Sequence, residues 1–496
     1  MTESKDAPKE EKKDNKSEDI PKDNIVETQK SINIQGKSYN YTTTTGTIVL
    51  REEEEEKAPQ PKATMFFVAY TLNDVKNPAS RPLTFSFNGG PGSSSVWLHM
   101  GLLGPQRVIA EKGGQPVPPP YKLIANEHSL LDTTDLVFID PVSTGYSRAV
   151  PGEKDKQFHD FEKDVRSVGE FIRLYTSRYT RWSSPKFLIG ESYGTTRAAA
   201  LSGFLQKDYG LFLNGIMLIS SILNFQTAQF QPGNDWPYML FLPTYTAGAW
   251  YHSKLPQDLL DKDLSQVLDE VKVFSETEYN LALMQGDLLQ GEEREAMVSK
   301  LARFTGLSPD YVRQTNLRIN IHKFTKELLR NERKTIGRLD SRFTGLERDA
   351  TGLTTTYDPS YAVIQGPYTA SFNHYVRAEL NFESDLPYEI LNPKTNQNWK
   401  YDTFQNKYVD VAETLRGAMC MNPFLKVFVA NGFYDLATPF FATEYTFRHL
   451  SLEPEVRKNI SMGYYQAGHM MYTNAECLAQ LKADLTKFVL ESSGLE

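Results

Sequence analysis

A serine between two glycines, in the segment Gly190-Glu191-Ser192-Tyr193-Gly194, constrains the fold of this chain more than any other feature. An apolar run at residues 186–189 precedes the segment, and a helical pattern rich in small residues follows it. A serine in this setting occupies a strained turn from a strand into a helix, where the two elements nearly collide. Small residues are needed two positions on either side of the serine, and Gly190 and Gly194 meet that need.

Short apolar runs alternate with helical patterns around this turn. Residues 83–87, 136–139, 186–189 and 216–219 are candidate buried strands. Between the second and third of these runs, residues 161–175 carry apolar side chains at helical spacing. Strands that alternate with helices predict a mainly parallel sheet covered on both faces.

The pattern divides the chain into four parts. Residues 1–25 are rich in charged side chains without apolar periodicity, which predicts a disordered tail. Residues 26–224 form the first part of the core and open with an alternation typical of antiparallel strands. Longer helical patterns at 225–401 indicate an inserted cap, and residues 402–496 return to the core and end in a helix at 475–490.

Composition excludes several classes of protein. The formal net charge of −8 argues against the concentrated basic face of a nucleic-acid-binding protein. The apolar runs are shorter than the roughly 18 residues that span a bilayer, so we expect no membrane span. Cys420 and Cys477 are the only cysteines, and whether they are bridged stays open. No paired histidine spacing, phosphate loop or dinucleotide fingerprint is present, so we expect neither a metal nor a cofactor.

Two later segments supply the partners that a serine nucleophile needs. Asp435 lies beyond the carboxyl end of a predicted strand at 427–430, where open α/β sheets build their sites. His469 follows on a loop before the final helix, which gives the chain order serine, acid, histidine. A neutral imidazole accepts the serine proton, and a buried carboxylate fixes the tautomer of that imidazole. We therefore assign Ser192, Asp435 and His469 as a candidate catalytic triad.

A glycine-rich segment at residues 88–92 follows the predicted strand at 83–87. Glycine lets bare backbone approach a ligand closely. We expect the backbone N–H groups of Gly90 and Tyr193 to form an oxyanion hole, which stabilises the developing alkoxide of an acyl-transfer reaction. The loss of one such donor costs about 3 kcal/mol of transition-state stabilisation.

Together, four motifs in this order resemble the serine carboxypeptidase family. They read Asn88-Gly89-Gly90-Pro91-Gly92-Ser93-Ser94-Ser95, Gly190-Glu191-Ser192-Tyr193, Gly432-Phe433-Tyr434-Asp435 and Ala467-Gly468-His469-Met470. The resemblance runs from about residue 84 to the C-terminus and is loose in the cap region. It implies an α/β-hydrolase fold, with a central mostly parallel sheet, helices on both faces, antiparallel N-terminal strands and an inserted, largely helical cap.

The resemblance also implies an activity and a set of substrate-binding residues. A serine carboxypeptidase releases C-terminal residues from peptides, here through an acyl-enzyme on Ser192. Asn88 and Glu191 would bind the free carboxylate of the substrate, and Met470 would line a pocket for the leaving residue. Two bare carboxylates repel each other, so the substrate binds well only if it shares a proton with Glu191. We therefore expect acidic pH to favour peptides.

Some positions depart from the family pattern. Leu102 stands where a second glutamate is usual, Ser93 where a cysteine is usual, and Met471-Tyr472 where a proline is usual. Leu102 favours an alternative function, an esterase, amidase or acyltransferase with the same triad, because fold and triad do not fix the acyl donor. A third hypothesis is a non-catalytic binding protein with a relic triad.

Peptides are the expected partners, while residue preference and oligomeric state stay open. The family resemblance implies an exported protein, in a periplasm, outside the cell or in an acidic compartment, if a signal was removed. The charged N-terminal segment lacks the apolar region of a secretory signal. We therefore expect a cytoplasmic location if the N-terminus is native.

Overall fold

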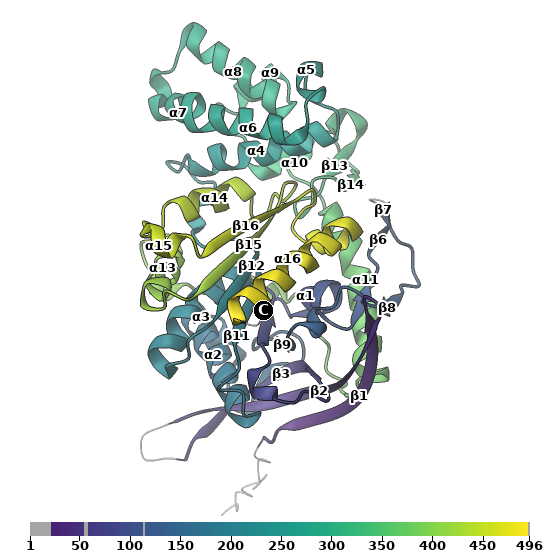
Figure 1. The fold of residues 1–496 in the computed structure, drawn as a ribbon. Coiled ribbons are helices and arrows are strands. Elements are labelled where there is room, and N and C mark those ends of the chain that lie inside the picture. The colour runs from purple at the N-terminus through teal and green to yellow at the C-terminus, as the bar shows by residue number, and fades with distance from the viewer. Residues whose placement is uncertain (1–20, 54–57, 113–114, 495–496) are drawn as a thin grey trace, which may run out of the picture.

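A mixed sheet runs through the core of the molecule (Figure 1). The computed structural model describes residues 21–53, 58–112 and 115–494. Its main strands are β1 (Asn24–Ile34), β2 (Lys37–Glu52), β3 (Gln60–Leu72), β4 (Leu83–Phe87), β9 (Asp135–Ile139), β10 (Arg148–Ala149), β11 (Lys186–Ser192), β12 (Gly215–Ser221), β15 (Lys426–Gly432) and β16 (Ile460–Tyr465). In these ranges the sheet has ten strands.

The strand order explains where the site forms. The order is β1-β2-β3-β9-β4-β11-β12-β15-β16, and the short β10 pairs with β3. The pairs β1-β2, β2-β3 and β3-β9 are antiparallel, whereas all pairs from β9 to β16 are parallel. Parallel strands bring their carboxyl ends to one edge, so the loops after β4, β11, β15 and β16 meet there.

Most of the predicted strands are confirmed. The runs at 83–87, 136–139, 186–189, 216–219 and 427–430 form β4, β9, β11, β12 and β15. Strand β16 was not predicted, because it is an edge strand with mostly half-buried side chains and therefore has no continuous apolar run. Residues 1–20 of the predicted tail lie outside the described residues, and β1 begins at Asn24, within the last two residues of that predicted tail.

Alternate side chains of the strands build one apolar cluster on each face of the sheet. In β11, Phe187 and Ile189 point to one cluster and Leu188 to the other. Helices cover both faces (Figure 1). One cluster is closed by α2 (Phe161–Arg178), α3 (Tyr193–Tyr209) and α13 (Ala412–Met421), and the other by α1 (Val96–Leu98), α11 (Pro359–Ala378) and α16 (Ala475–Ser493).

The helix predicted at 161–175 is confirmed as α2, and its sequence explains its start and its orientation. The Asp160 side chain accepts hydrogen bonds from the backbone N–H groups of Glu162 and Lys163, which caps the first turn. Apolar side chains at helical spacing then face the sheet. The helix predicted at 475–490 is likewise confirmed as α16.

A third apolar cluster lies within a helical layer above the sheet (Figure 1). The layer consists of α4 (Trp236–Tyr251), α5 (Gln257–Leu260), α6 (Leu264–Phe274), α7 (Asn280–Gln285), α8 (Gly291–Thr305), α9 (Pro309–Gln314) and α10 (Ile321–Glu327). The later helix α11 packs against the sheet instead. None of the described helices is both long and apolar enough to cross a bilayer.

Short elements connect these layers. The small strand pairs are β5 (Gln106–Val108) with β8 (Leu123–Ala125), β6 (Glu111–Lys112) with β7 (Gln115–Pro116), and β13 (Lys334–Ile336) with β14 (Thr344–Leu346). The short helices are α12 (Pro393–Gln397), α14 (Phe440–Arg448) and α15 (Pro454–Arg457).

Candidate active site

Ser192 lies at the turn between β11 and α3, as the sequence predicts. Its φ of 61° and ψ of −130° place it in a region that residues with a side chain rarely adopt. A Cβ on Gly190 would lie 2.1 Å from the carbonyl oxygen of Gly194, and a Cβ on Gly194 would lie 2.8 Å from that of Phe87. Both glycines are therefore required by the close approach of backbone segments.

His469 and Asp435 form a buried pair, with 2.7 Å between Nδ1 and Oδ2. The fully buried Asp435 carboxylate also accepts hydrogen bonds from the backbone N–H groups of Ala437, at 2.8 Å, and Thr438, at 3.1 Å. The Thr438 hydroxyl donates to Oδ2 at 2.7 Å. This arrangement favours a proton on Nδ1 of His469 and leaves Nε2 as the basic nitrogen.

The backbone brings the His469 loop beside the nucleophile. Ser192 pairs with Ser221 of β12, and the hydroxyl of the adjacent Ser220 donates to the His469 carbonyl oxygen at 2.7 Å. No hydrogen bond joins the Ser192 hydroxyl to the imidazole among the described residues. Such bonds are often long in free enzymes and shorten when substrate binds.

The charge state of His469 follows from two opposing effects. Burial lowers the pKa of His469. The negative charge of Asp435 and its hydrogen bond to Nδ1 raise the pKa and outweigh burial, so the net shift is upward. The imidazole is thus an effective proton acceptor at pH values above this raised pKa.

The segment of residues 338–342 holds the histidine loop in place. The His469 N–H donates to the Leu339 carbonyl oxygen at 2.6 Å, and the Gly468 N–H donates to Asp340 Oδ2 at 3.0 Å. Arg342 pairs with the same Asp340 carboxylate at 2.7 Å. No sequence motif marked this segment, which lies between β13 and β14 and far from residue 469 in the chain.

The two predicted oxyanion donors lie on segments that touch. Gly89 approaches the turn at Ser192 so closely that a Cβ on Gly89 would lie 2.4 Å from the backbone N of Tyr193. Gly90 has a φ of 105°, which favours glycine. Tyr193 begins α3, so its N–H has no partner within the helix, and the positive end of the helix dipole points the same way.

Asn88 and Glu191, the predicted carboxylate-binding pair, are in contact and buried. Asn88 Nδ2 donates to Glu191 Oε1 at 3.0 Å, and Asn88 Oδ1 accepts from the Leu98 N–H at 3.1 Å. Burial raises the pKa of Glu191 to about 7. At neutral pH a fraction of the protein molecules therefore carry a proton on Glu191, which can be shared with a bound carboxylate.

Two functional contacts were missed by sequence reasoning. The Tyr472 hydroxyl donates to Glu191 Oε2 at 2.6 Å. Arg197 of α3 donates to the Asn88 carbonyl oxygen at 2.6 Å and pairs with Asp164 of α2 at 2.7 Å. An arginine within a helix of small residues was the one available signal for the second contact.

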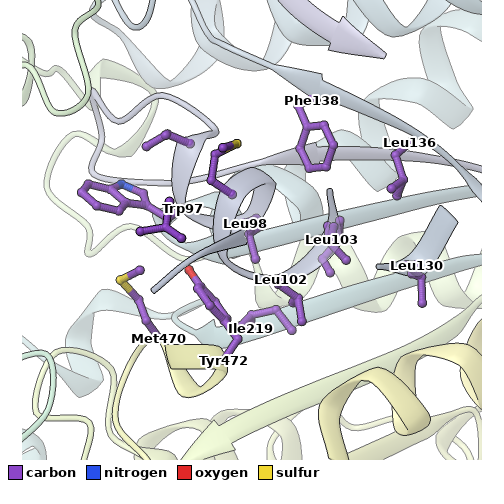
Figure 2. Packing of buried hydrophobic residues seen from close by; sticks show 14 of the residues in the cluster. Trp97, Leu98, Leu102, Leu103, Leu130, Leu136, Phe138, Ile219, Met470 and Tyr472 are labelled. Carbon is purple, nitrogen blue, oxygen red and sulfur yellow. The ribbon is translucent and has the colours of Figure 1, made fainter. Parts of the chain in front are cut away.

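Leu102 and Met470 lie in the apolar cluster that α1, α11 and α16 close. Figure 2 shows Leu102 in that cluster together with Trp97 and Met470. Met470 is buried, and its role in a leaving-residue pocket stays a prediction.

The two cysteines are not bridged: Cys420 is exposed and Cys477 is buried.

Several known proteins are similar to this chain in sequence. A family model described as serine carboxypeptidase matches residues 53–482. The pheromone-processing carboxypeptidase KEX1 of Saccharomyces cerevisiae is 34% identical over 137 residues, which are 26% of this chain and 17% of the yeast protein. Serine carboxypeptidase-like 34 of Arabidopsis thaliana is 27% identical over 207 residues, or 40% of each chain. The chain thus matches less than half the length of either relative.

A solved structure supports the same fold. The crystal structure of KEX1ΔP, a prohormone-processing carboxypeptidase from Saccharomyces cerevisiae, aligns with a TM-score of 0.53 over 91% of both chains at 17% identity. Together with the strand order and the strand-to-helix turn at Ser192, this likeness confirms the predicted α/β-hydrolase fold.

Proposed function

Because the chain belongs to the serine carboxypeptidase family, we propose that it releases C-terminal residues from peptides through an acyl-enzyme on Ser192. The single observation that carries this proposal is the buried contact of Asn88 with Glu191, directly beside the nucleophile. A partly protonated carboxyl at this place can bind the terminal carboxylate of a peptide, and the bond to be cut then lies one residue away, near Ser192.

The chemistry follows from the positions of the groups. His469 Nε2 takes the Ser192 proton as Oγ bonds to the scissile carbonyl carbon, and the oxyanion is stabilised by the N–H groups of Gly90 and Tyr193. The tetrahedral intermediate expels the amine of the leaving residue, which takes the proton from His469. Water then attacks the acyl-enzyme by the same route, which releases the shortened peptide and restores Ser192.

A pair of matched peptides tests the proposal. Peptides of one sequence, with either a free C-terminal carboxylate or a C-terminal amide, are incubated with the purified protein, and released amino acids are identified. We expect one residue at a time from the free acid and at least about tenfold slower cleavage of the amide, the loss typical of a hydrogen bond to a charged group. Equal rates for the two peptides would rule out carboxylate recognition.

A covalent label separates the triad from the substrate preference. A fluorophosphonate should label the wild-type protein and fail to label Ser192→Ala, because the reagent needs an activated serine. Absence of labelling from the wild type would contradict an activated Ser192 and would support the third hypothesis of a binding protein, whereas equal labelling of both proteins would place the reactive nucleophile at another residue.

One observation favours a second function for the same triad. The side chain of Leu102, at the position where the family resemblance led us to expect a glutamate, is buried and apolar. An esterase, amidase or acyltransferase would not need a second carboxyl there. A panel of short esters and amides, assayed beside free-acid peptides, distinguishes the two, since this alternative predicts the higher kcat/KM for substrates without a terminal carboxylate.

We also infer that the helical layer α4–α10 acts as a cap over the site, within the predicted insertion at 225–401. The support for this role is the segment 338–342, which follows that layer in the chain and contacts the histidine loop. Side chains of the layer would then contribute to residue preference.

A further inference from the structure

Both oxygens of the Glu191 carboxyl have a hydrogen-bond donor. Asn88 donates to Oε1, and the Tyr472 hydroxyl donates to Oε2 at 2.6 Å, which is the shorter of the two contacts. Tyr472 is buried, with 1% of its surface exposed, and lies three residues after His469. The residue that carries the catalytic imidazole and the residue that holds Glu191 therefore sit on the same short loop.

The chain makes room for the Tyr472 ring. A Cβ on Gly101 would lie 2.4 Å from Cε2 of Tyr472, so the ring rests against bare backbone. Gly101 belongs to a π-helical turn, His99–Leu103, a distortion that is frequent at functional sites. Figure 2 shows Tyr472 beside Leu102 of the same turn, and leucine offers no polar atom. The phenol is thus the group that completes the hydrogen bonding of Glu191 on this side.

From this geometry we propose that Tyr472 is a positioning residue, whose hydroxyl orients the Glu191 carboxyl toward the terminal carboxylate of the substrate. The inference rests on the function proposed above. Because Glu191 and the buried phenol form a charge-assisted hydrogen bond whenever Glu191 is ionised, the contact also sets the proton affinity of the carboxyl.

The phenol stays protonated throughout the working range. Burial and the charge of Glu191 raise the pKa of Tyr472 well above its ordinary value. The other titratable groups that act on Glu191 are His469 and Asp435, from the loops after β16 and β15, and Tyr368 of α11 also interacts with it. Among these, Tyr472 donates a hydrogen bond directly to the carboxyl, which favours its ionised form and keeps its pKa from rising further.

Removal of the hydroxyl should therefore have two separate effects. In Tyr472→Phe the Glu191 carboxyl loses its orientation, so KM for a free-acid peptide should rise about tenfold, the usual loss for a hydrogen bond to a charged group. The ionised form of Glu191 also loses stabilisation, so the fall of kcat/KM on the alkaline side should move to higher pH. If Tyr472 only filled space, phenylalanine would fill the same space, and both KM and the alkaline fall of kcat/KM would stay as in the wild type.

The experiment compares Tyr472→Phe with Tyr375→Phe as a matched control. Tyr375 is a phenol buried in the same apolar cluster, and its hydroxyl contacts Tyr70 instead of the site. Rates are measured on a free-acid peptide and on an ester from about pH 5 to about pH 9, the range in which catalytic histidine and carboxyl groups titrate. Ester hydrolysis should stay within about twofold of wild type in Tyr375→Phe. In Tyr472→Phe it should lose less than cleavage of the free-acid peptide does, because an ester has no terminal carboxylate for Glu191 to bind.

Each outcome has one meaning. If wild type cleaves amidated and free peptides equally, the proposed function fails. If wild type prefers free acids and Tyr472→Phe keeps the wild-type KM and alkaline limb, the positioning role of Tyr472 is wrong and the proposed function stands. Gly101→Ala serves as a second variant: its Cβ would lie 2.4 Å from both Cε2 of Tyr472 and the Tyr368 hydroxyl, so the Tyr472 ring should move and KM for the free acid should rise in the same way.

Discussion

At the scale of single residues, the reaction needs opposite protonation states in two neighbours. His469 must be neutral to accept the Ser192 proton, so its raised pKa makes activity increase with pH. Glu191 must hold a proton to share with the substrate carboxylate, and its pKa of about 7 means that this proton is lost as pH rises through about 7. The predicted preference for acidic pH should therefore end near pH 7, where Glu191 loses its proton.

We therefore expect kcat/KM for a free-acid peptide to fall as pH rises through about 7, the pKa of the buried Glu191 carboxyl. An ester lacks the terminal carboxylate, so its kcat/KM should not fall there. In Glu191→Gln the alkaline fall should disappear for the peptide, because the amide cannot titrate but still donates a hydrogen bond. Pre-steady-state or initial-rate profiles for both substrates check this, and superimposable profiles in wild type would contradict it.

The buried acid of the triad gives a second prediction at this scale. Asp435→Asn should keep the fold and lower kcat by roughly a thousandfold or more, because an amide no longer fixes the imidazole tautomer. Thr438→Val is the control: it removes a hydroxyl that donates to the same carboxylate at 2.7 Å and should lower kcat by about tenfold or less. Initial rates on an ester measure both, and a kcat for Asp435→Asn within tenfold of wild type would remove Asp435 from the triad.

At the scale of helices and strands, local sequence patterns were enough to predict most of the fold. Buried parallel strands such as β11 and β15 are continuous apolar runs, and the glycines around Ser192 mark a turn that few residues can form. The contacts that complete the site were not predictable in this way. Tyr472 meets Glu191 across 281 positions, and Arg197 meets Asn88 across 109, and no local period relates residues so far apart.

The Arg197–Asp164 pair connects α3, α2 and the glycine-rich loop, and gives the prediction at this scale. Arg197→Met leaves a buried carboxylate without its partner, which should lower the free energy of unfolding by about 3–5 kcal/mol. Arg197→Met with Asp164→Leu should recover much of that stability, since no buried charge is left alone. Activity should not recover, because the Asn88 carbonyl oxygen still lacks the donor at 2.6 Å. Urea unfolding and ester kinetics on both proteins test this. Full activity in the double variant would show that the hydrogen bond from Arg197 to the Asn88 carbonyl oxygen is not needed for catalysis.

At the scale of the whole molecule, the segment 338–342 contacts the loops of the core that carry Asp435 and His469. The segment 338–342 lies between β13 and β14, in the part of the chain predicted as an insertion, yet it donates and accepts hydrogen bonds with both loops that carry the acid and the imidazole. The Leu436 N–H, next to Asp435, donates to the Arg338 carbonyl oxygen at 3.0 Å. Sequence reasoning placed the triad within the core alone, because nothing in the pattern near residue 340 indicates this contact.

This connection predicts that Asp340→Asn impairs catalysis without touching the triad. The carboxylate pairs with Arg342 and accepts from the Gly468 N–H, so its loss should loosen the loop that aims His469. Because small misplacements of a catalytic group strongly slow a reaction, we expect kcat to fall about tenfold or more for peptide and ester alike. Asp385→Asn is the matched control, since the Arg377–Asp385 pair is exposed and should contribute little. A wild-type kcat in Asp340→Asn, with its thermal unfolding shifted, would show that the segment supports stability alone and does not position the imidazole.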